Sequence, residues 1–323
     1  MSLTKKDYLE YLFRIYALKQ GTITKSWNGP SKVNYFDKQN KPVSWPYYLD
    51  FSKDVKDSLL RDPNGIPIID YANLGTHYNP WFIGHIALGH YTLWVNNHRE
   101  SDKQYFKKLA DWFVNNAKRT HNGIAWFYHF DYFGGQEKPW KSGLSQAHAI
   151  STLLRAATQF NDRQYSEFAR LAVDEMVADL KDSGTTLYHQ NNSLSFEEYL
   201  CEKPYSVLNG HLFSTFACWE ASVFFEDKIL QEKSEMAFNF VLNYIEKYDL
   251  GFWSTYSLKK TGPFKDIASH HYHDVHISQL EAAYFITGLE KFKEFSNKFR
   301  RYQNSFLKKN KALVYKSIVK ILS

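Results

Sequence analysis

A chain of 323 residues with 44% hydrophobic and 23% charged residues has the balance of a folded globular protein, which excludes a disordered or low-complexity chain. Its net charge of +6 would attract an acidic polysaccharide, a nucleic acid or an anionic membrane surface, and without an arginine-rich stripe or zinc-finger spacing nucleic acid is the weakest of the three. No N-terminal secretion signal is present and no apolar run approaches the roughly 20 residues of a membrane span, so we expect a cytoplasmic protein.

The first 75 residues are expected to form a helix followed by loops. Residues 4–19 carry apolar side chains at three- and four-residue spacing, with Thr4 as a cap and Gly21 just beyond the end, which predicts a helix. Residues 20–75 are rich in Gly, Pro, Asn and Asp and favour loops with short strands or hairpins. We expect residues 1–75 to pack on a main domain formed by residues 76–310.

From Pro80 onward the periodicity is helical. It predicts four successive helix pairs, over residues 81–96 and 103–119, 144–159 and 163–180, 206–224 and 228–247, and 275–288 and 290–307. Loops rich in Gly, aromatic and charged residues separate the pairs, and long loops in compact domains are commonly functional; they span residues 120–143, 183–205 and 248–273. This alternation predicts a mainly α fold, an incomplete α/α toroid whose inner helices line a cleft. An irregular bundle without a cleft is the alternative.

The C-terminal end has a different charge pattern. Between Asn297 and Ser323 the chain carries many Lys and Arg residues and no acid. Residues 311–323 have the pattern of a basic amphipathic segment, which would rest on a membrane surface or a partner, or else pack back on its own domain. A homodimer is a further option for this chain.

Three clusters combine aromatic and polar side chains in loops or at helix starts, where residues held by a rigid helix commonly carry chemistry. Paired carboxylates with tyrosine indicate proton transfer, either in glycoside hydrolysis or in abstraction next to a carbonyl. The clusters are Phe196-Glu-Glu-Tyr199, Trp253-Ser-Thr-Tyr-Ser-Leu258 and Ser269-His-His-Tyr-His-Asp-Val-His-Ile277.

Little in the sequence indicates a metal or a nucleotide. The four histidines between His270 and His276 lack an HExxH or CxxC partner, so metal binding is not the expectation. His273 and His276 lie one turn apart at a helix start, where we expect hydrogen bonds to substrate or helix capping. No phosphate-binding or dinucleotide-binding loop occurs. The two cysteines, Cys201 and Cys218, do not make a disulfide framework. We therefore expect chemistry without a cofactor.

Five motifs, in order, resemble the D-glucuronyl C5-epimerase family, whose members convert D-glucuronate to L-iduronate within heparan-type polymers. The resemblance covers most of the chain from about Tyr78. The animal enzymes carry a β-sandwich between the first and second helix pairs, for which residues 97–143 leave no room. The motifs span residues 78–91, 143–156, 197–199 with 206–210, 255–258 and 272–280.

The resemblance implies a cofactor-independent epimerase acting on an acidic polysaccharide of the heparosan or heparan type. It implies that Glu198 and Tyr272 flank C5 of the sugar as base and proton donor, with Tyr256 assisting and Tyr199 as a further participant. Inversion needs one group on each face, and donors must hold the carboxylate as an enediolate forms. The free pKa of glutamate, about 4.3, predicts an ionised base at neutral pH. Candidate substrate contacts are Tyr78, Gln146, His148, Asn209, Lys259, His273 and His276.

Two other functions remain open at this point. A polysaccharide lyase would begin with the same abstraction of the C5 proton but would then expel the 4-O-linked sugar. A non-catalytic glycan-binding scaffold would use the aromatic side chains, 18% of the residues, to stack on sugar rings without exchanging a proton.

Overall fold

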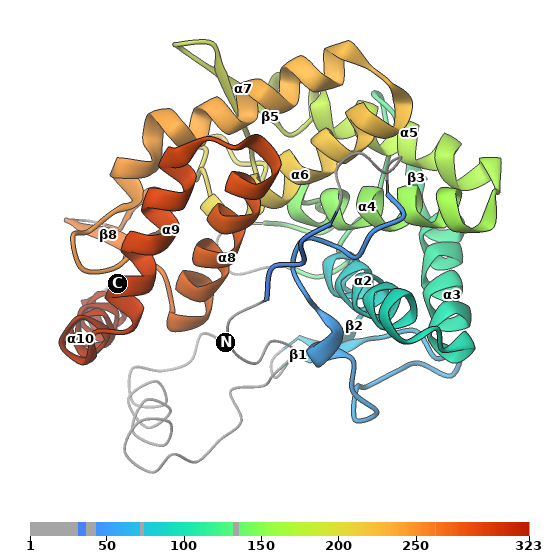
Figure 1. Ribbon diagram of the computed structural model, residues 1–323, viewed down its shortest axis with the longest axis horizontal. Coiled ribbons are helices and arrows are strands. Elements are labelled where there is room, and N and C mark those ends of the chain that lie inside the picture. Colours follow the sequence, from blue (N-terminus) through green and yellow to red (C-terminus); the bar gives the residue numbers. More distant parts are fainter. Residues whose placement is uncertain (1–31, 37–42, 72–73, 132–135, 262, 323) are drawn as a thin grey trace.

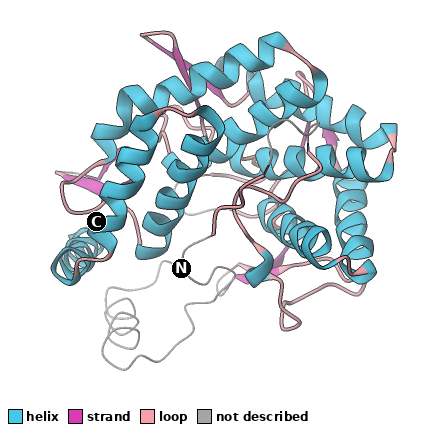
Figure 2. Cartoon of the chain, viewed as in Figure 1, coloured by secondary structure: helices cyan, strands magenta, loops and turns pink. Residues whose placement is uncertain are grey.

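The computed structural model describes residues 32–36, 43–71, 74–131, 136–261 and 263–322 (Figure 1). Most of these residues are helical, and short two-stranded ribbons lie in the loops (Figure 2). The expected mainly α fold is confirmed, whereas the helix expected over residues 4–19 lies outside the described residues. Among the helices described, none combines the length and the apolar character needed to cross a bilayer.

Four helix pairs build the domain. The helices of a pair pack against each other, and the first helices of the pairs contact one another in succession, from α2 through α4 and α6 to α8. These first helices form an inner arc and their partners lie outside it (Figure 1), which is the expected incomplete α/α toroid. The pairs are α2 Pro80–Asn97 with α3 Glu100–Asn116, α4 Gly143–Phe160 with α5 Arg163–Val177, α6 Leu208–Phe225 with α7 Lys228–Tyr244, and α8 His270–Thr287 with α9 Glu290–Gln303.

The sequences of the helices explain which ones lie inside. α2 and α6 are apolar around most of their circumference and are buried along most of their length. α5 and α9 instead place a charged face opposite an apolar face, as expected for helices between core and solvent. Side chains cap several helix starts, since the oxygens of Asn79, Ser142 and Ser269 accept backbone N–H bonds at the start of α2, α4 and α8.

Two helix boundaries differ from the expected ones by more than three residues. α8 begins at His270 rather than at 275, because the Ser269 hydroxyl accepts the N–H of Tyr272 and caps the helix there. The helix expected over residues 290–307 ends at Gln303, and a separate helix, α10 Phe306–Leu322, follows it. The expected basic tail of residues 311–323 is therefore the larger part of α10.

Two-stranded antiparallel ribbons occupy the segments ahead of the inner helices. The loops expected over residues 183–205 and 248–273 each contain one, another begins at Lys118, within the helix expected over residues 103–119, and one precedes α2. Thr186 of β5 lies opposite Phe196 of β6, and Thr255 of β7 lies opposite Ile267 of β8. Each ribbon therefore lies on the chain just before an inner helix begins. The ribbons are β1 Ile69–Tyr71 with β2 Gly75–His77, β3 Lys118–Arg119 with β4 Ile124–Ala125, β5 Thr186–His189 with β6 Ser193–Phe196, and β7 Thr255–Thr261 with β8 Phe264–Ile267.

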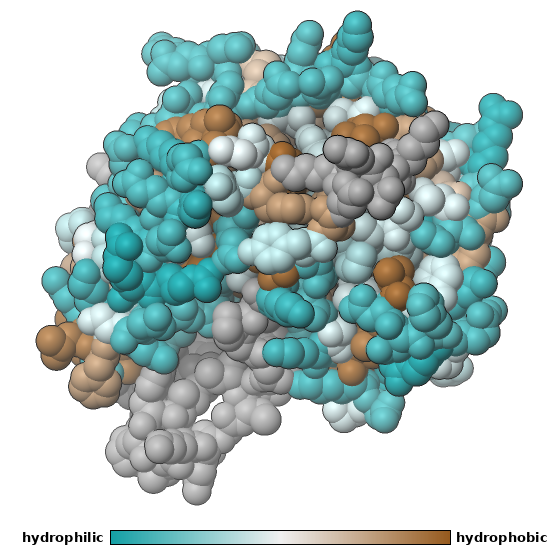
Figure 3. Space-filling model, in the orientation of Figure 1, coloured by the Kyte–Doolittle hydropathy of each residue, from teal (hydrophilic) through white to brown (hydrophobic). Residues whose placement is uncertain are grey.

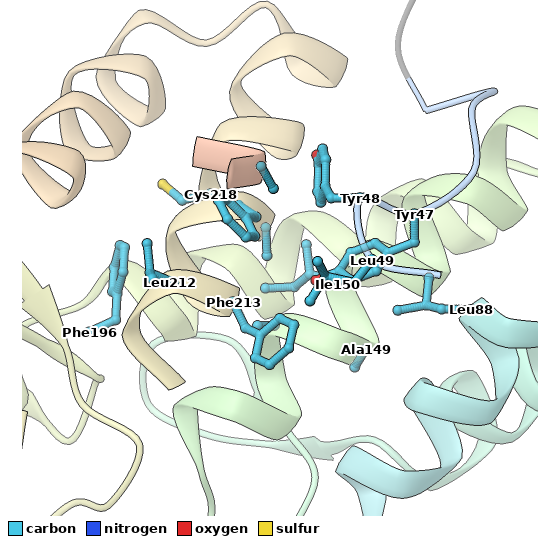
Figure 4. Close-up of a cluster of buried hydrophobic side chains, with 14 of the residues drawn as sticks. Tyr47, Tyr48, Leu49, Leu88, Ala149, Ile150, Phe196, Leu212, Phe213 and Cys218 are labelled. Carbon is cyan, nitrogen blue, oxygen red and sulfur yellow. The ribbon is translucent and has the colours of Figure 1, made fainter. Parts of the chain in front are cut away.

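Residues 43–55, which include the short 3-10 helix η1 Ser52–Asp54, fill the middle of the arc. Tyr47, Tyr48 and Phe51 are fully buried there (Figure 4 shows Tyr47 and Tyr48). The ring of Phe51 lies 4.0 Å from that of His85 in α2, and the ring of Tyr48 lies 5.1 Å from that of Phe216 in α6. The middle of the arc is therefore packed protein.

A buried ion pair joins two inner helices within this core. The Arg155 guanidinium of α4 lies 2.6 Å from the Glu220 carboxylate of α6, and both side chains are fully buried. The hydroxyl of Ser151 donates to the other carboxylate oxygen at 2.5 Å. Because a buried charge without its partner is costly, this pair fixes α4 against α6.

Candidate active site

A cavity of about 220 Å³ lies where the four inner helices begin. Each of these helices contributes residues from its cap or first two turns: Asn79 and Trp81 of α2, Ser142 and Leu144 of α4, Asn209 and Phe213 of α6, and His271 and Tyr272 of α8. A helix N-terminus presents unpaired N–H groups and the positive end of its dipole. Four such ends make the cavity favourable to an anion, although no lysine or arginine of the described chain lines it.

Glu198 is the carboxylate that lines this cavity within the described residues. The hydroxyl of Tyr256 donates to its Oε1 at 3.4 Å, and Tyr199 is also hydrogen-bonded to this carboxylate. Its Oε2 lies over Gly210 and is buried without a hydrogen-bond partner among the described residues. A Cβ atom at position 210 would overlap Oε2, so only glycine leaves room for the carboxylate at the start of α6.

The environment of Glu198 changes its acidity. Burial raises its pKa to about 7, and hydrogen bonds from Tyr199 and Tyr256 offset only part of this effect. The expectation of an ordinary, fully ionised glutamate is therefore wrong. A group with a pKa near neutral suits both the uptake and the release of a proton near pH 7.

The neighbouring Glu197 has a different role. Its Oε1 accepts from the hydroxyl of Ser195 at 2.7 Å, and its Oε2 accepts from the backbone N–H of Ser206 at 2.8 Å. These bonds hold Glu197 in the protein interior, whereas Glu198 lines the cavity.

Three tyrosines lie beside Glu198. Tyr199 and Tyr272 line the cavity, and the ring of Tyr256, from β7, lies 4.7 Å from the ring of Tyr272. Burial, and then the charge of Glu198, raise the pKa of Tyr256 well above its usual value, so its phenol stays protonated. The structure thus brings together all four of the residues expected to be catalytic.

His271 is a cavity residue that the sequence analysis did not select. It is the second residue of α8, and burial followed by the nearby His85 lowers its pKa to about 4. His85 is itself bonded to Asp54 at 3.0 Å, and Asp54 partly offsets the lowering. His271 is therefore a neutral imidazole at neutral pH. Ser269 as a helix cap is the signal that would have placed it in the first helical turn beside Tyr272.

Aromatic walls are the other feature that the sequence analysis did not assign. Trp81, Trp140, Tyr71 and Phe130 line the cavity, and the ring of Trp140 stacks on Tyr128 at 4.0 Å. Flat aromatic surfaces of this kind pack well against sugar rings. A high aromatic content alone does not reveal which rings line a cavity and which fill the core.

Asn209 is the expected substrate-contact residue that the structure places in the cavity. Its backbone carbonyl accepts from the side chain of Gln279 at 2.9 Å, which fixes the first turn of α6. Its side-chain oxygen is buried and has no hydrogen-bond partner among the described residues. A buried amide oxygen in this state is suited to a hydroxyl of a bound ligand.

The polar groups of α4 lie outside the residues that line the cavity. Gln146 donates to the carbonyls of Ile124 and Ala172 at 2.7 and 3.0 Å, so its amide nitrogen is used within the interior. His148 is fully buried and bonded to the carbonyl of Leu144 at 3.0 Å. Burial lowers the pKa of His148 to about 3.

The two expected histidines of α8 are also interior groups. Nδ1 of His273 and Nδ1 of His276 lie 2.7 and 3.0 Å from the hydroxyl of Ser254. Nε2 of His273 is bonded to the carbonyl of Phe299 at 3.0 Å. These bonds fasten α8 to the segment before β7. No group of three or more metal-binding side chains occurs in the described parts of the chain.

Tyr78 and Lys259 lie on the surface. The hydroxyl of Tyr78 donates to Asp62 at 2.6 Å, in a groove distinct from the cavity. Lys259 donates to the hydroxyl of Tyr205 at 2.6 Å, in an open groove of about 1060 Å³ that shares Trp140 with the cavity. This neighbouring groove also contains Arg119, Lys141 and Lys203.

Two known proteins are similar in sequence to this chain. The chain is 26% identical over 216 residues to the D-glucuronyl C5-epimerase of Caenorhabditis elegans, which covers 61% of this chain and 34% of that protein. It is 27% identical over 189 residues to an uncharacterized protein of Methanocaldococcus jannaschii, which covers 55% of this chain and 57% of that protein. The chain therefore spans between a third and three fifths of the length of these relatives.

Among solved structures, the GH76 α-mannanase of Bacteroides thetaiotaomicron aligns with a TM-score of 0.48 and 12% identity, over 72% of this chain and 58% of that chain. The family model for the D-glucuronyl C5-epimerase C-terminus matches residues 119–301. This match covers more than half of the 323 residues and includes Glu198, Tyr199, Tyr256 and Tyr272. The chain belongs to the family described as the D-glucuronyl C5-epimerase C-terminus.

Proposed function

We propose that the protein is a uronate C5-epimerase that converts D-glucuronate to L-iduronate residues in an acidic polysaccharide of the heparosan or heparan type. One observation carries the proposal: Glu198, a buried carboxyl with a pKa of about 7, lies in a cavity ringed by the N-terminal ends of four helices. Abstraction of a proton next to a carboxylate needs a base at the carbon and a positive environment for the growing charge. Family membership supports the same chemistry.

In the first step, ionised Glu198 takes the C5 proton of the sugar. The electron pair of the broken C–H bond moves into a bond between C5 and the carboxylate carbon, which gives an enediolate with added charge on its oxygens. A carboxylate with a pKa of about 7 is a stronger base than an ordinary glutamate and is still ionised in about half of the molecules at pH 7.

In the second step, the phenol of Tyr272 delivers its proton to the opposite face of C5. The electron pair returns to C5 as the new C–H bond forms, which leaves Glu198 protonated and Tyr272 ionised. Tyr256, which is hydrogen-bonded to Glu198 and whose ring packs against Tyr272, assists the proton transfer at Glu198. Protonated Glu198 then loses its proton to solvent and ionised Tyr272 takes one from solvent, which restores the starting state. In the reverse direction, Glu198 and Tyr272 exchange roles.

Two groups are suited to hold the substrate. We assign the substrate carboxylate to His271, because a neutral imidazole at a helix N-terminus can donate its N–H to a developing oxyanion. We assign a sugar hydroxyl to the Asn209 amide oxygen, which is otherwise unpaired within the described chain. The four helix N-termini then supply a positive field in the cavity, whose lining does not include Lys259.

The rest of the polymer is assigned to the neighbouring groove. The cavity is smaller than the roughly 300 Å³ at which sites for drug-sized ligands begin, so it suits a single sugar ring. The groove that shares Trp140 with it contains Arg119, Lys203 and Lys259, and their charges would attract the anionic sugars on either side of the reacting one.

The proposal is tested by incubating the protein with a panel of uronate polymers in deuterated water. An epimerase incorporates deuterium at C5, forms L-iduronate and leaves the chain length unchanged. A lyase, the second candidate from the sequence, shortens the polymer and produces an ultraviolet-absorbing unsaturated uronate. Binding of polymer without exchange or cleavage would favour the non-catalytic scaffold and reject the proposal.

A further inference from the structure

Helix α10 packs on the domain through one of its faces. Ala312 is buried, and the hydroxyl of Tyr315 accepts the backbone N–H of Lys265 at 3.1 Å. The ammonium group of Lys316 donates to the carbonyl of Ile267 at 2.8 Å. These contacts attach α10 to β8, and further contacts attach it to α9. They fix the direction in which the other face of the helix points.

The opposite face of α10 is apolar and exposed. Leu307, Val314 and Ile318 recur at intervals of seven and four residues, which places them on one side of a helix. Their exposed fractions are 79%, 58% and 43%, and Phe306 at the start of the helix is 78% exposed. Hydrophobic side chains appear at the lower left of Figure 3, where Figure 1 places α10. These side chains form an apolar stripe, with Asn310 and Lys311 between Leu307 and Val314, and an exposed stripe of this kind is suited to binding a partner.

The charges of α10 indicate what that partner is. The helix contains five lysines and no acid, and Lys309 and Lys311 are exposed. Lys311 lies one turn from both Leu307 and Val314, beside the apolar stripe. A basic helix with an exposed apolar face is typical of segments that lie in the plane of an anionic lipid surface. A second copy of the chain fits less well, because two such faces would bring lysines together without an acid to pair with them.

We propose that the exposed face of α10 docks on an anionic lipid surface. Leu307, Val314 and Ile318 would enter the boundary between headgroups and acyl chains, and Lys311, which lies beside them, would lie among the headgroups. The 17-residue helix would lie parallel to the lipid surface, with its apolar side facing the acyl chains. Docking would hold the protein through β8, which belongs to the same ribbon as Tyr256. This inference does not depend on the reaction proposed above.

The test is flotation of the full chain with lipid vesicles of phosphatidylcholine, alone or with about a third phosphatidylglycerol. We expect binding to the anionic vesicles only, and weaker binding as salt is raised. The double variant Leu307→Gln/Val314→Gln should bind at least roughly tenfold more weakly, because it removes most of the apolar stripe and keeps every lysine. Ile229→Gln is the matched control, since Ile229 is an apolar residue of α7 that is 65% exposed, and it should bind like the parent.

Three results would overturn the proposal. The first is equal binding of the parent to neutral and anionic vesicles, or none to either. The second is a double variant that binds as well as the parent. The third is a parent that light scattering finds dimeric and a double variant that it finds monomeric, because the stripe would then join two copies. Circular dichroism checks that the variants are folded, and Val314→Gln alone replaces the double variant if it is not.

Discussion

The carboxyl group of Glu198 lies directly over the Cα atom of Gly210, with no room between them for a methyl group. The contact joins the proposed base, on the segment after β6, to the first turn of α6. Glu198 is held on its other side by Tyr256, from β7. Three segments far apart in the sequence therefore fix the position of one carboxyl group in the cavity.

Gly210→Ala should displace this carboxyl group and lower the rate of C5 exchange by about 100-fold, which is the scale of a displacement of about 1 Å in an active site. Alanine stabilises a helix relative to glycine by up to about 1 kcal/mol. This gain should offset much of the strain from the displaced carboxyl group, so the free energy of unfolding should change little. The rate of deuterium exchange and urea unfolding measure the two effects. Ser214→Ala, one turn further along α6, should keep the parent rate. A Gly210→Ala protein with the parent rate would contradict the positioning of Glu198.

Glu198→Gln should stabilise the fold at alkaline pH. Because the pKa of Glu198 is raised from 4.5 to about 7, its contribution to stability is fully present below pH 4.5 and is lost as the pH rises through 7. Above pH 7 the buried charge costs about 3 kcal/mol by this shift, and an amide avoids that cost. In urea unfolding, the variant should have a higher free energy of unfolding than the parent at about pH 8.5, and this gain should be absent at about pH 4.5. The same gain at both pH values would contradict the raised pKa.

Tyr272→Phe should separate proton exchange from inversion. Without the phenol, Glu198 can still remove the C5 proton and return a deuteron to the same face, so the starting sugar should acquire deuterium while the epimer does not form. Nuclear magnetic resonance of the recovered polymer distinguishes the two sugars. Tyr284→Phe, in the last turn of the same helix, is the matched control and should form the epimer normally. Normal epimer formation by Tyr272→Phe would remove Tyr272 from the mechanism.

His271→Leu should lower kcat by about 100-fold or more while affinity for the polymer changes little, because its N–H acts on charge that develops during the reaction. His271→Asn, which retains an N–H donor, should recover part of the rate. His121→Gln, a change in the neighbouring groove, should affect affinity rather than kcat. Equal rates for His271→Leu and His271→Asn would mean that the imidazole only fills space.

The protein should lose stability as the pH falls below 6.5. Burial lowers the pKa of His148, His211 and His273 to about 3, so these groups stay neutral in the fold but bind protons once it unfolds. Stability is therefore present above pH 6.5 and is lost as the pH falls toward 3, at about 1.4 kcal/mol per pH unit for each histidine. Glu198 and Asp274 act in the opposite direction, because their carboxyl pKa values are raised.

Urea unfolding at several pH values measures how steeply the free energy of unfolding changes with pH. His211→Gln should reduce this slope by the equivalent of about one bound proton, since it removes one of the neutral histidines. A slope that is unchanged in this variant would mean that His211 titrates alike in the folded and unfolded chain.

Much of the fold could be predicted from the sequence, because periodicity and caps are local signals. α5 begins at Arg163 as expected, since Asp162 accepts the N–H of Gln164 and ends the preceding turn. The β1–β2 ribbon begins within residues 20–75, where short strands are expected. The strands of the later ribbons are not predicted, because most of them have only two to four residues and carry too little alternation to be recognised. The start of α8 was misplaced because the sequence does not show whether Ser269 caps a helix or lies in a loop.

The candidate site could be predicted only in part, and mainly through family resemblance. Glu198 and Tyr272 are recognisable from their motifs, and the structure places both in one cavity. Gln146 and His273 belong to similar motifs but use their polar groups inside the protein. Sequence alone does not separate a buried polar group that is satisfied internally from one that faces a cavity. That distinction depends on packing between segments far apart along the chain.

The position of the first deuterium atoms tests the central claim most directly. Early in a reaction in deuterated water, the parent should place deuterium in the newly formed epimer and not in the unreacted sugar, because separate groups serve the two faces of C5. Glu198→Gln should incorporate almost none in either sugar. Rapid incorporation by Glu198→Gln, or equal early labelling of both sugars by the parent, would contradict the account.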